Sequence, residues 1–205
     1  MSFVLSEDEA LKNLFAGMTV SDDKQPERPV DVFYAIPDVE IRQQRYPYIT
    51  IDLVDIRPAN ERQTSGYMFD KDYLGTIPAQ EDTVYTYYMP VAYDLVYQVS
   101  SWSRHPRHDR ALLQQMLRNR LPAKYGKLAV PNDLGTETAQ RSMFLDAFAK
   151  INYVEDGRRV FRNLFTVRIV SEMTPAQADS VSDKIVEKVV INGITGDIPS
   201  SLNPV

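Results

Sequence analysis

The chain has 205 residues, of which 43% are hydrophobic and 25% are charged, values typical of a globular protein with an ordinary hydrophobic core. It contains no cysteine, which excludes disulfides, cysteine-ligated metal sites and a thiol nucleophile. The formal net charge of −5 argues against wholesale coating of nucleic acid. We expect no signal peptide and no membrane span, because no apolar run approaches about 18 residues.

The first predicted element is a helix over residues 6–15. Ser6 suits the N-cap position, and Glu9 stands three residues later, as a capping box requires. The next segment, SDDKQPERPVD, is polar and contains two prolines, which favours a linker. We therefore expect residues 1–29 to form an N-terminal arm, made of a helix and a linker, that docks elsewhere.

Two strands are predicted next, over residues 30–36 and 48–56, because both segments are rich in β-branched and aromatic residues. Pro37 and Pro58 end them. The following stretch, residues 57–82, is mostly polar and too long for a plain connection. We expect it to form a loop or a β-hairpin excursion.

The longest strand-like run, TVYTYYMPVAYDLVYQVSSW, covers residues 83–102 and alternates with period two in its second half. The pattern then changes, since apolar residues recur at helical spacing over residues 110–121 while the arginines lie largely off that stripe. Pro122 ends this predicted helix. The segment KLAVP, residues 127–131, is expected to be a short strand.

A long antiparallel hairpin is predicted over residues 142–171, because Asp156 and Gly157 near its middle are a strong turn signal. Residues 174–190 then fit a helix with Pro175 at its first position.

The order of elements predicts an α+β protein with a mainly antiparallel sheet and one or two helices packed on one face. We expect a single domain over residues 30–190 that includes the long hairpin, preceded by the helical arm and followed by a polar tail over residues 191–205.

Positive charge gathers in one part of this acidic chain. Between Ser103 and Lys127 there are five arginines, two lysines and a single acid, a local net charge of +6. Such a run is often only the solvated face of a helix. It also fits a surface that meets an acidic partner, either DNA or a neighbouring subunit.

The same region holds both histidines of the chain, in the motif HPRHD. His105, His108 and Asp109 could act as metal ligands or acid–base groups of a metal-dependent hydrolase or nuclease. The alternative is a helix N-terminus with exposed histidines, because a metal site needs three or four converging ligands. No nucleophile motif and no glycine-rich phosphate loop is present, so we expect no cofactor, no bound metal and no catalytic residue.

Tyrosine is common, with twelve residues gathered in YPY, YTYY and YDLVY. Tyrosine supplies a large contact area and a hydroxyl for the wet edge of an interface. It also favours half-buried sheets. Both interpretations remain open from the sequence.

Two regions of the chain, residues 93–131 and 156–172, resemble the tail-terminator and tail-completion proteins of tailed bacteriophages. The first contains YDLVYQVSSWSRHPRHDRALLQQMLRNRLP followed by KLAVP, and the second is DGRRVFRNLFTVRIVSE. The shared pattern is a strand ending in tryptophan, an Arg- and Asp-bearing turn, a helix ending in LP, a short strand, and a hairpin turn that leads into an alternating strand. The N-terminal arm and the excursion over residues 57–82 have no obvious counterpart in the smaller terminators.

The resemblance implies a non-enzymatic virion protein of the tail or neck, assembled in the host cytoplasm. Proteins of this family form a ring, usually a hexamer, that caps the completed tail tube and offers a docking face for the head. The implied partners are further copies of the chain, the tail tube protein and a head-completion or neck protein, with DNA passing through the lumen without specific binding. Alternative positions are a head-side stopper, a sheath cap or a baseplate adaptor.

By position, the basic helix and the hairpin turn are candidates for ring contacts or for the lumen. The residues concerned are Trp102, Arg104, Arg107, Arg110, Arg118, Arg120, Arg158 and Arg159.

Overall fold

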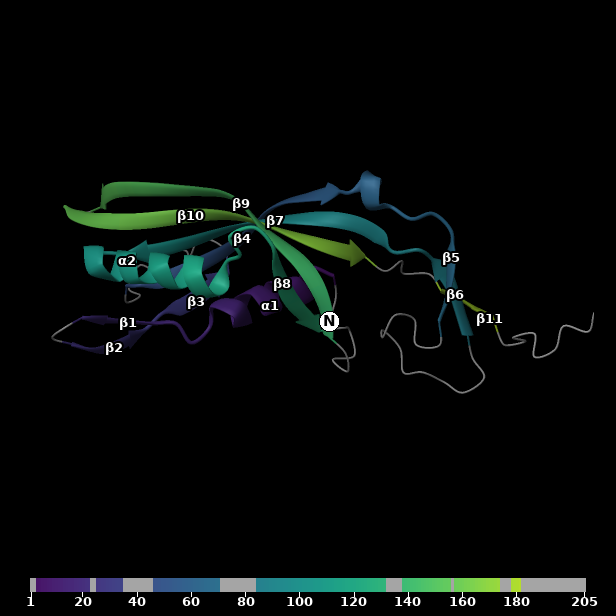
Figure 1. The fold of residues 1–205 in the computed structure, drawn as a ribbon, viewed down its shortest axis with the longest axis horizontal. Helices are drawn as coiled ribbons and strands as arrows, with labels where there is room; N and C mark the ends of the chain where they lie inside the picture. The colour runs from purple at the N-terminus through teal and green to yellow at the C-terminus, as the bar shows by residue number, and fades with distance from the viewer. Residues whose placement is uncertain are drawn as a thin grey trace, which may run out of the picture.

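The computed structural model describes residues 3–22, 25–34, 46–70, 84–131, 138–155, 157–173 and 178–181. Most of them lie in β-strands, and two helices pack beside the largest sheet (Figure 1). The expectation of an α+β protein is therefore confirmed. No helix in these ranges is both long enough and apolar enough to cross a membrane.

The main sheet has six strands in the order β3-β4-β7-β10-β9-β8. The β3 and β4 strands run parallel, whereas the other neighbouring strands pair antiparallel, so the sheet is mixed. The strand bounds are β3 Asp31–Tyr34, β4 Tyr48–Pro58, β7 Val91–Ser103, β8 Gly126–Pro131, β9 Thr138–Glu155 and β10 Arg158–Met173.

Both helices lie on the same face of this sheet (Figure 1). They are α1, Leu5–Phe15, and α2, Pro106–Gln115, which continues as the π-helical turn η3, Met116–Arg120. Pro106 stands at the start of α2, where its fixed φ suits a helix and its missing N–H costs nothing.

Two smaller sheets accompany the main one. A two-stranded hairpin is formed by β1, Thr19–Asp22, and β2, Gln25–Pro29. A three-stranded sheet in the order β11-β6-β5 lies beyond one end of the main sheet (Figure 1). Its strands are β5 Tyr67–Asp70, β6 Val84–Tyr88 and β11 Ala178–Val181, and the short helical turn η2, Asn60–Arg62, lies before it in the chain.

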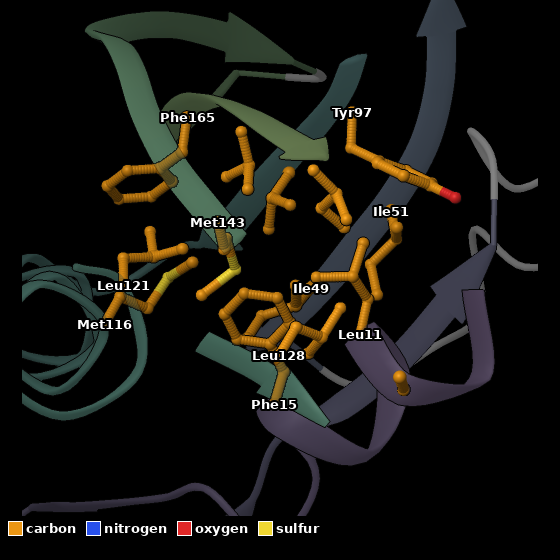
Figure 2. Packing of buried hydrophobic residues seen from close by; sticks show 14 of the residues in the cluster. Leu11, Phe15, Ile49, Ile51, Tyr97, Met116, Leu121, Leu128, Met143 and Phe165 are labelled. Atoms are coloured by element: carbon orange, nitrogen blue, oxygen red, sulfur yellow. The ribbon is translucent and has the colours of Figure 1, made fainter. Parts of the chain in front are cut away.

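The hydrophobic core fills the space between the two helices and the main sheet (Figure 2). Helix α1 contributes Leu11 and Phe15, and α2 contributes Leu112. The sheet contributes the core-facing residues of each strand, including Ile49 and Phe165. Each such side chain stabilises the fold by roughly 1.5–3 kcal/mol through burial.

This core changes the interpretation of the N-terminal arm. Leu11 and Phe15 are fully buried against the sheet, so α1 is an integral part of the core rather than an appendage. Its first turn also differs from the expected capping box, because the helix begins at Leu5 and the carboxylate that binds the backbone N–H of Val4 is that of Glu7, at 2.9 Å.

The expected linker after α1 is also structured. The strands β1 and β2 pair with each other in an antiparallel ladder, and Val20 of β1 is buried in the core. The side-chain amide of Gln115 donates a hydrogen bond of 2.8 Å to the carbonyl of Thr19. Tertiary contact with α2 therefore outweighs the polar composition of this segment.

The expected helix over residues 174–190 is wrong where the structure describes it. Residues 178–181 form β11, which pairs antiparallel with β6. The ladder that β6 offers supplies the backbone hydrogen bonds that a helix would otherwise provide. The remainder of the predicted helix and the tail over residues 191–205 lie outside the described residues.

Polar contacts fix α1 on the sheet as well. The buried carboxylate of Glu7 accepts a hydrogen bond from the hydroxyl of Ser171 on β10. Asp8 accepts a hydrogen bond of 2.7 Å from the hydroxyl of Tyr97 on β7. These contacts align the start of the helix with the two central strands.

The Asp8 contact predicts a pH dependence. Burial raises the pKa of Asp8 above its usual 3.8, although the Tyr97 hydrogen bond opposes this rise and the charge of Glu7 adds to it. A carboxyl with a raised folded-state pKa contributes most stability below its unfolded pKa and loses that contribution as pH rises through the folded pKa.

The Asp8→Asn variant keeps an acceptor for Tyr97 but carries no charge. Relative to the wild type, it should therefore become progressively more stable as pH rises from about 3 to about 7. Urea unfolding at a series of pH values measures this difference. A difference between the two proteins that stays constant with pH would contradict the assignment.

Candidate assembly interface

The long β9–β10 hairpin carries both buried and exposed apolar side chains. On β10, Phe165, Val167 and Ile169 are fully buried towards the helices. The second half of β9 instead presents apolar side chains to solvent. Its exposed large residues are Phe148, Ile151, Tyr153 and Val154, the last being 68% exposed. This half of the hairpin is therefore suited to contact another protein.

The hairpin turn lies at the end of the main sheet opposite the three-stranded sheet (Figure 1). Gly157 has φ +72°, a left-handed conformation that glycine adopts without strain. Arg158 and Arg159 follow directly, and both side chains are exposed. The two hairpin arginines predicted as contact residues thus lie on the surface, at a projecting turn.

Trp102, in contrast to these arginines, is buried. Its ring is 7% exposed, and its Nε1 donates a hydrogen bond of 3.0 Å to the hydroxyl of Thr50. Tyr48 stacks on it at 5.8 Å between ring centroids, and the guanidinium of Arg162 lies 4.4 Å from the ring centre. The tryptophan therefore joins β4, β7 and β10 and is an internal anchor, with little surface left for a partner.

Arg104 lies at the rim of this aromatic cluster. Its guanidinium lies 4.4 Å from the ring centre of Tyr46 and 3.9 Å from Glu155. The hydroxyl of Tyr46 also donates to Glu155, at 3.4 Å. Burial raises the pKa of Tyr48 and of Tyr153, the tyrosines on either side of the cluster, so both stay neutral at physiological pH. The cluster ties the end of β9 to the start of β4.

Helix α2 presents most of the predicted basic face. Arg107, Arg110 and Arg118 are exposed, whereas Arg120 is partly buried and donates to the carbonyl of Ala16 at 3.4 Å. The apolar side of the same helix, with Leu112 fully buried, packs on the sheet. The exposed arginines therefore lie on the side of the helix that faces solvent.

A buried polar cluster holds α2 against the hairpin. Asp109, only 2% exposed, accepts hydrogen bonds from the ammonium of Lys150 on β9 and from the amide of Asn163 on β10, the latter at 2.7 Å. The amide of Asn163 also donates to the hydroxyl of Ser101, at 3.1 Å. This cluster fixes the first turn of the basic helix over the hairpin.

In the HPRHD motif the His105 and His108 rings lie 5.2 Å apart between their centroids, and His105 and Asp109 each form hydrogen bonds within the fold. His105 is exposed, and its Nδ1 accepts a hydrogen bond of 3.3 Å from the backbone N–H of Arg107, which makes it the N-cap of α2. His108 is buried, and Asp109 uses both carboxylate oxygens in the cluster. Within the described ranges, no three His, Cys, Asp or Glu side chains are grouped to hold a metal ion.

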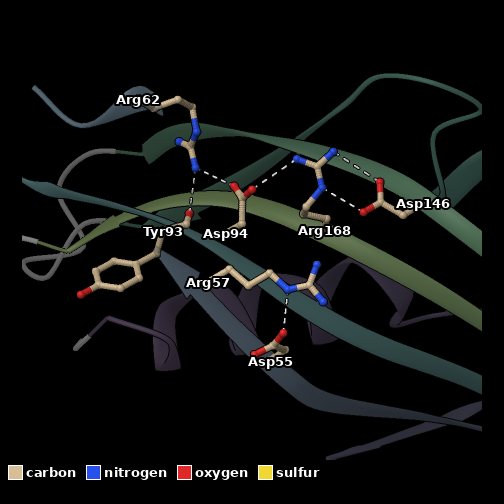
Figure 3. Close-up of polar contacts among 7 residues, drawn as sticks. All are labelled: Asp55, Arg57, Arg62, Tyr93, Asp94, Asp146 and Arg168. Atoms are coloured by element: carbon tan, nitrogen blue, oxygen red, sulfur yellow. Dashed lines mark hydrogen bonds and ion pairs between the residues drawn. The ribbon is translucent and has the colours of Figure 1, made fainter. Parts of the chain in front are cut away.

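The sheet face opposite the helices carries a chain of ion pairs (Figure 3). Asp94 on β7 lies 2.6 Å from Arg62 and 3.5 Å from Arg168 on β10. Arg168 in turn pairs with Asp146 on β9 at 2.9 Å. Because these groups are partly exposed, each pair contributes at most about 1 kcal/mol. The two arginines and the two aspartates balance one another in charge.

The three-stranded sheet supplies a second aromatic surface. Tyr67, Phe69 and Tyr88 are all exposed, and the Tyr67 and Tyr88 rings lie 4.8 Å apart. The sequence predicted a loop or a β-hairpin excursion over residues 57–82. The described part of that stretch contains the helical turn η2 and the strand β5. The tyrosines thus divide between buried or half-buried positions, at Tyr97 and Tyr48, and exposed ones on this sheet.

Three features of this region were not predicted from the sequence. They are the contact of Lys150 with Asp109, the contact of Asn163 with Asp109, and the exposed apolar residues of β9. Asn163 interrupts the apolar face of the return strand, and that interruption was the available signal for a buried polar contact. Lys150 had no comparable signal, because its partner lies 41 residues away in the sequence.

Comparison with known proteins finds similarity at the level of structure. No family model matches the chain, and no curated protein matches it. Among solved structures, the chain is similar to the sheath/tube terminator of an extracellular contractile injection system, PVC, in its extended state. The identity is 13% and the TM-score 0.36, and the match covers 93% of this chain and 66% of that chain.

Proposed function

We propose that this protein is a structural assembly protein of a phage-like tail, which forms a ring and terminates the tail tube. The observation that carries the proposal is the exposed half of the β9–β10 hairpin, where Phe148, Ile151 and Val154 are displayed on an ordered strand. Ordered apolar surface of this kind is suited to contact with another protein. A ring protein needs such a surface on each copy.

The basic helix supports the same proposal. Arg107, Arg110 and Arg118 stand exposed on an otherwise acidic chain. Arginine is enriched at protein interfaces and also attracts nucleic acid. In a ring, this face would meet either an acidic surface of the next copy or the DNA in the lumen.

The partners in this proposal are further copies of the chain, the tail tube protein and a head-side neck protein, and six copies is the expected ring number. The protein would act in the virion tail and carry out no catalysis. Its aromatic three-stranded sheet, with Tyr67, Phe69 and Tyr88, is the surface we assign to a tail partner, because aromatic residues are enriched in the cores of interfaces.

Electron microscopy with light scattering tests the proposal. Purified protein, alone or mixed with tail tubes, should give closed rings, and rings should be seen at one end of the tubes. Tubes assembled with the protein present should stop growing. Particles that remain monomeric even with excess tube present would refute the assembly function.

A further inference from the structure

The main sheet has two stretches of strand whose outer edge is open among the described residues. On one side, β8 pairs with β9 only over Thr138–Met143, which leaves Phe144–Glu155 paired with β10 alone. On the other side, β3 pairs with β4 only over Tyr48–Ile51, which leaves Asp52–Pro58 paired with β7 alone. In both stretches, alternate N–H and C=O groups face outwards and lack a strand partner in the described part of the chain.

Both open stretches also carry exposed apolar side chains. On β9 these include Phe148 and Val154, and on β4 they are Val54, 57% exposed, and Ile56, 42% exposed. Soluble proteins usually protect such edges with charged side chains or with proline. On β4 the only proline of the open stretch, Pro58, stands at its end, and Asp55 and Arg57 neutralise each other. Here the charges on β9 are neutralised within the same copy.

The neutralising partners are known for each charge on the open part of β9. Lys150 pairs with Asp109, Asp146 with Arg168, and Glu155 with Arg104. The open edge of β9 therefore offers an apolar, electrically balanced template for another strand.

Strand direction indicates which strand fits that template. From β4 through β7 and β10 to β9, neighbouring strands alternate in direction, so β4 and β9 run antiparallel across the sheet. A second copy set beside β9 in the same orientation brings its own β4 antiparallel to β9. The alternation then continues from one copy into the next, in the more stable pairing mode.

Charge favours the same arrangement. Arg158 and Arg159 are exposed beside the C-terminal end of β9. The open part of β4 begins at Asp52, while Asp55 further along it is already paired with Arg57 of the same copy at 2.6 Å. In an antiparallel pair these ends meet, so the two arginines of one copy approach Asp52 of the next.

We propose that the open edge of β9 (Phe144–Glu155) in one copy of the chain pairs with the open edge of β4 (Asp52–Pro58) in the next copy. The contact joins two different surfaces, the β9 edge of one copy and the β4 edge of the next. The pair therefore still has one free β4 edge and one free β9 edge, to which further copies can bind. The contact thus repeats from copy to copy and closes when the rotation allows, which is how a ring is built. This inference rests on the proposed ring and assigns its interface.

Cysteine cross-linking tests this interface directly, because the chain has no native cysteine. Ile56→Cys is combined in turn with Phe148→Cys, Asn152→Cys and Val154→Cys, which sample three registers on the same face of the sheet. Residues opposite each other in an antiparallel pair have Cβ atoms about 4.5–5.5 Å apart, close to the separation that a disulfide spans. One pair should give a ladder of covalent oligomers on a non-reducing gel, and reductant should remove it.

The matched control combines Ile56→Cys with Leu117→Cys, an exposed position on η3 outside both edges, and should give no ladder. Absence of a ladder from all three pairs, in protein that still forms rings by microscopy, overturns this interface and leaves the proposed function standing. Absence of any oligomer, with or without tubes, overturns both. Cross-linking within one chain, or covalent dimers that extend no further, also overturns the proposed pairing.

Discussion

Replacement of Phe15 with alanine should lower the free energy of unfolding by about 3–5 kcal/mol. The ring of Phe15 is fully buried between α1 and the sheet, in the same cluster as Ile49 and Leu128 (Figure 2). The substitution removes the buried ring and leaves a cavity that the surrounding strands cannot fill without moving. Urea unfolding followed by the fluorescence of the single tryptophan measures the change.

Leu5→Ala is the matched control, because Leu5 lies on the same helix but is 61% exposed. Its effect should stay within about 0.5 kcal/mol. Equal and small effects at both positions would mean that α1 does not pack on the sheet in solution. By the same reasoning, deletion of residues 1–29 should prevent stable folding, because it removes core side chains of α1 and β1 together.

Replacement of Asp109 with alanine should be the second strongly destabilising change, at about 2–4 kcal/mol. It removes the acceptor for Lys150 and for the fully buried amide of Asn163. The amide cannot reach water, whereas the partly exposed ammonium of Lys150 can recover some hydration, so the cost falls below that of a fully buried ion pair. Chemical unfolding of the variant gives the value.

Arg110→Ala is the control for this change, since Arg110 is the next residue on α2 and is exposed. It should alter stability by no more than about 0.5 kcal/mol. A double-mutant cycle with Lys150→Ala isolates the ion pair, and the two single changes should not add. Additive effects would show that the cluster does not couple α2 to the hairpin.

The two variants should also differ in assembly. Arg110→Ala leaves the fold intact, so a loss of ring formation in that variant would place the basic helix face at a contact between subunits. Asp109→Ala changes the anchoring of the helix itself, so its effect on ring formation should follow its effect on stability. Size-exclusion chromatography with light scattering separates the two outcomes.

The open edges connect stability with assembly. Exposed apolar strand edges are an aggregation hazard in a monomer. A closed ring would cover them, so a protein of this kind is expected to be most soluble when it is assembled. The exposed edges of β9 and β4 therefore make the single chain prone to aggregation and the proposed ring the form in which these edges are covered.

Local sequence pattern determined a large part of this fold. Period-two alternation predicted β7 and β10, apolar residues at helical spacing predicted α2, and the Asp156–Gly157 turn signal predicted the hairpin. These features depend on neighbours within a few residues, so the sequence alone carries them. It also supplied the basic run from Arg104 to Arg120 and the absence of cysteine that makes the cross-linking test possible.

Tertiary structure decided the rest. The docking of α1, the β1–β2 hairpin and the pairing of β11 with β6 all depend on contacts between distant segments, where long-range packing outweighs local propensity. The burial of Trp102 and the contact between Asp109 and Lys150 could not be predicted from the sequence for the same reason. Among the described residues, the two open edges arise because β8 and β3 are each shorter than the strand they pair with. Strand pairing is a property of the assembled sheet that no single segment specifies.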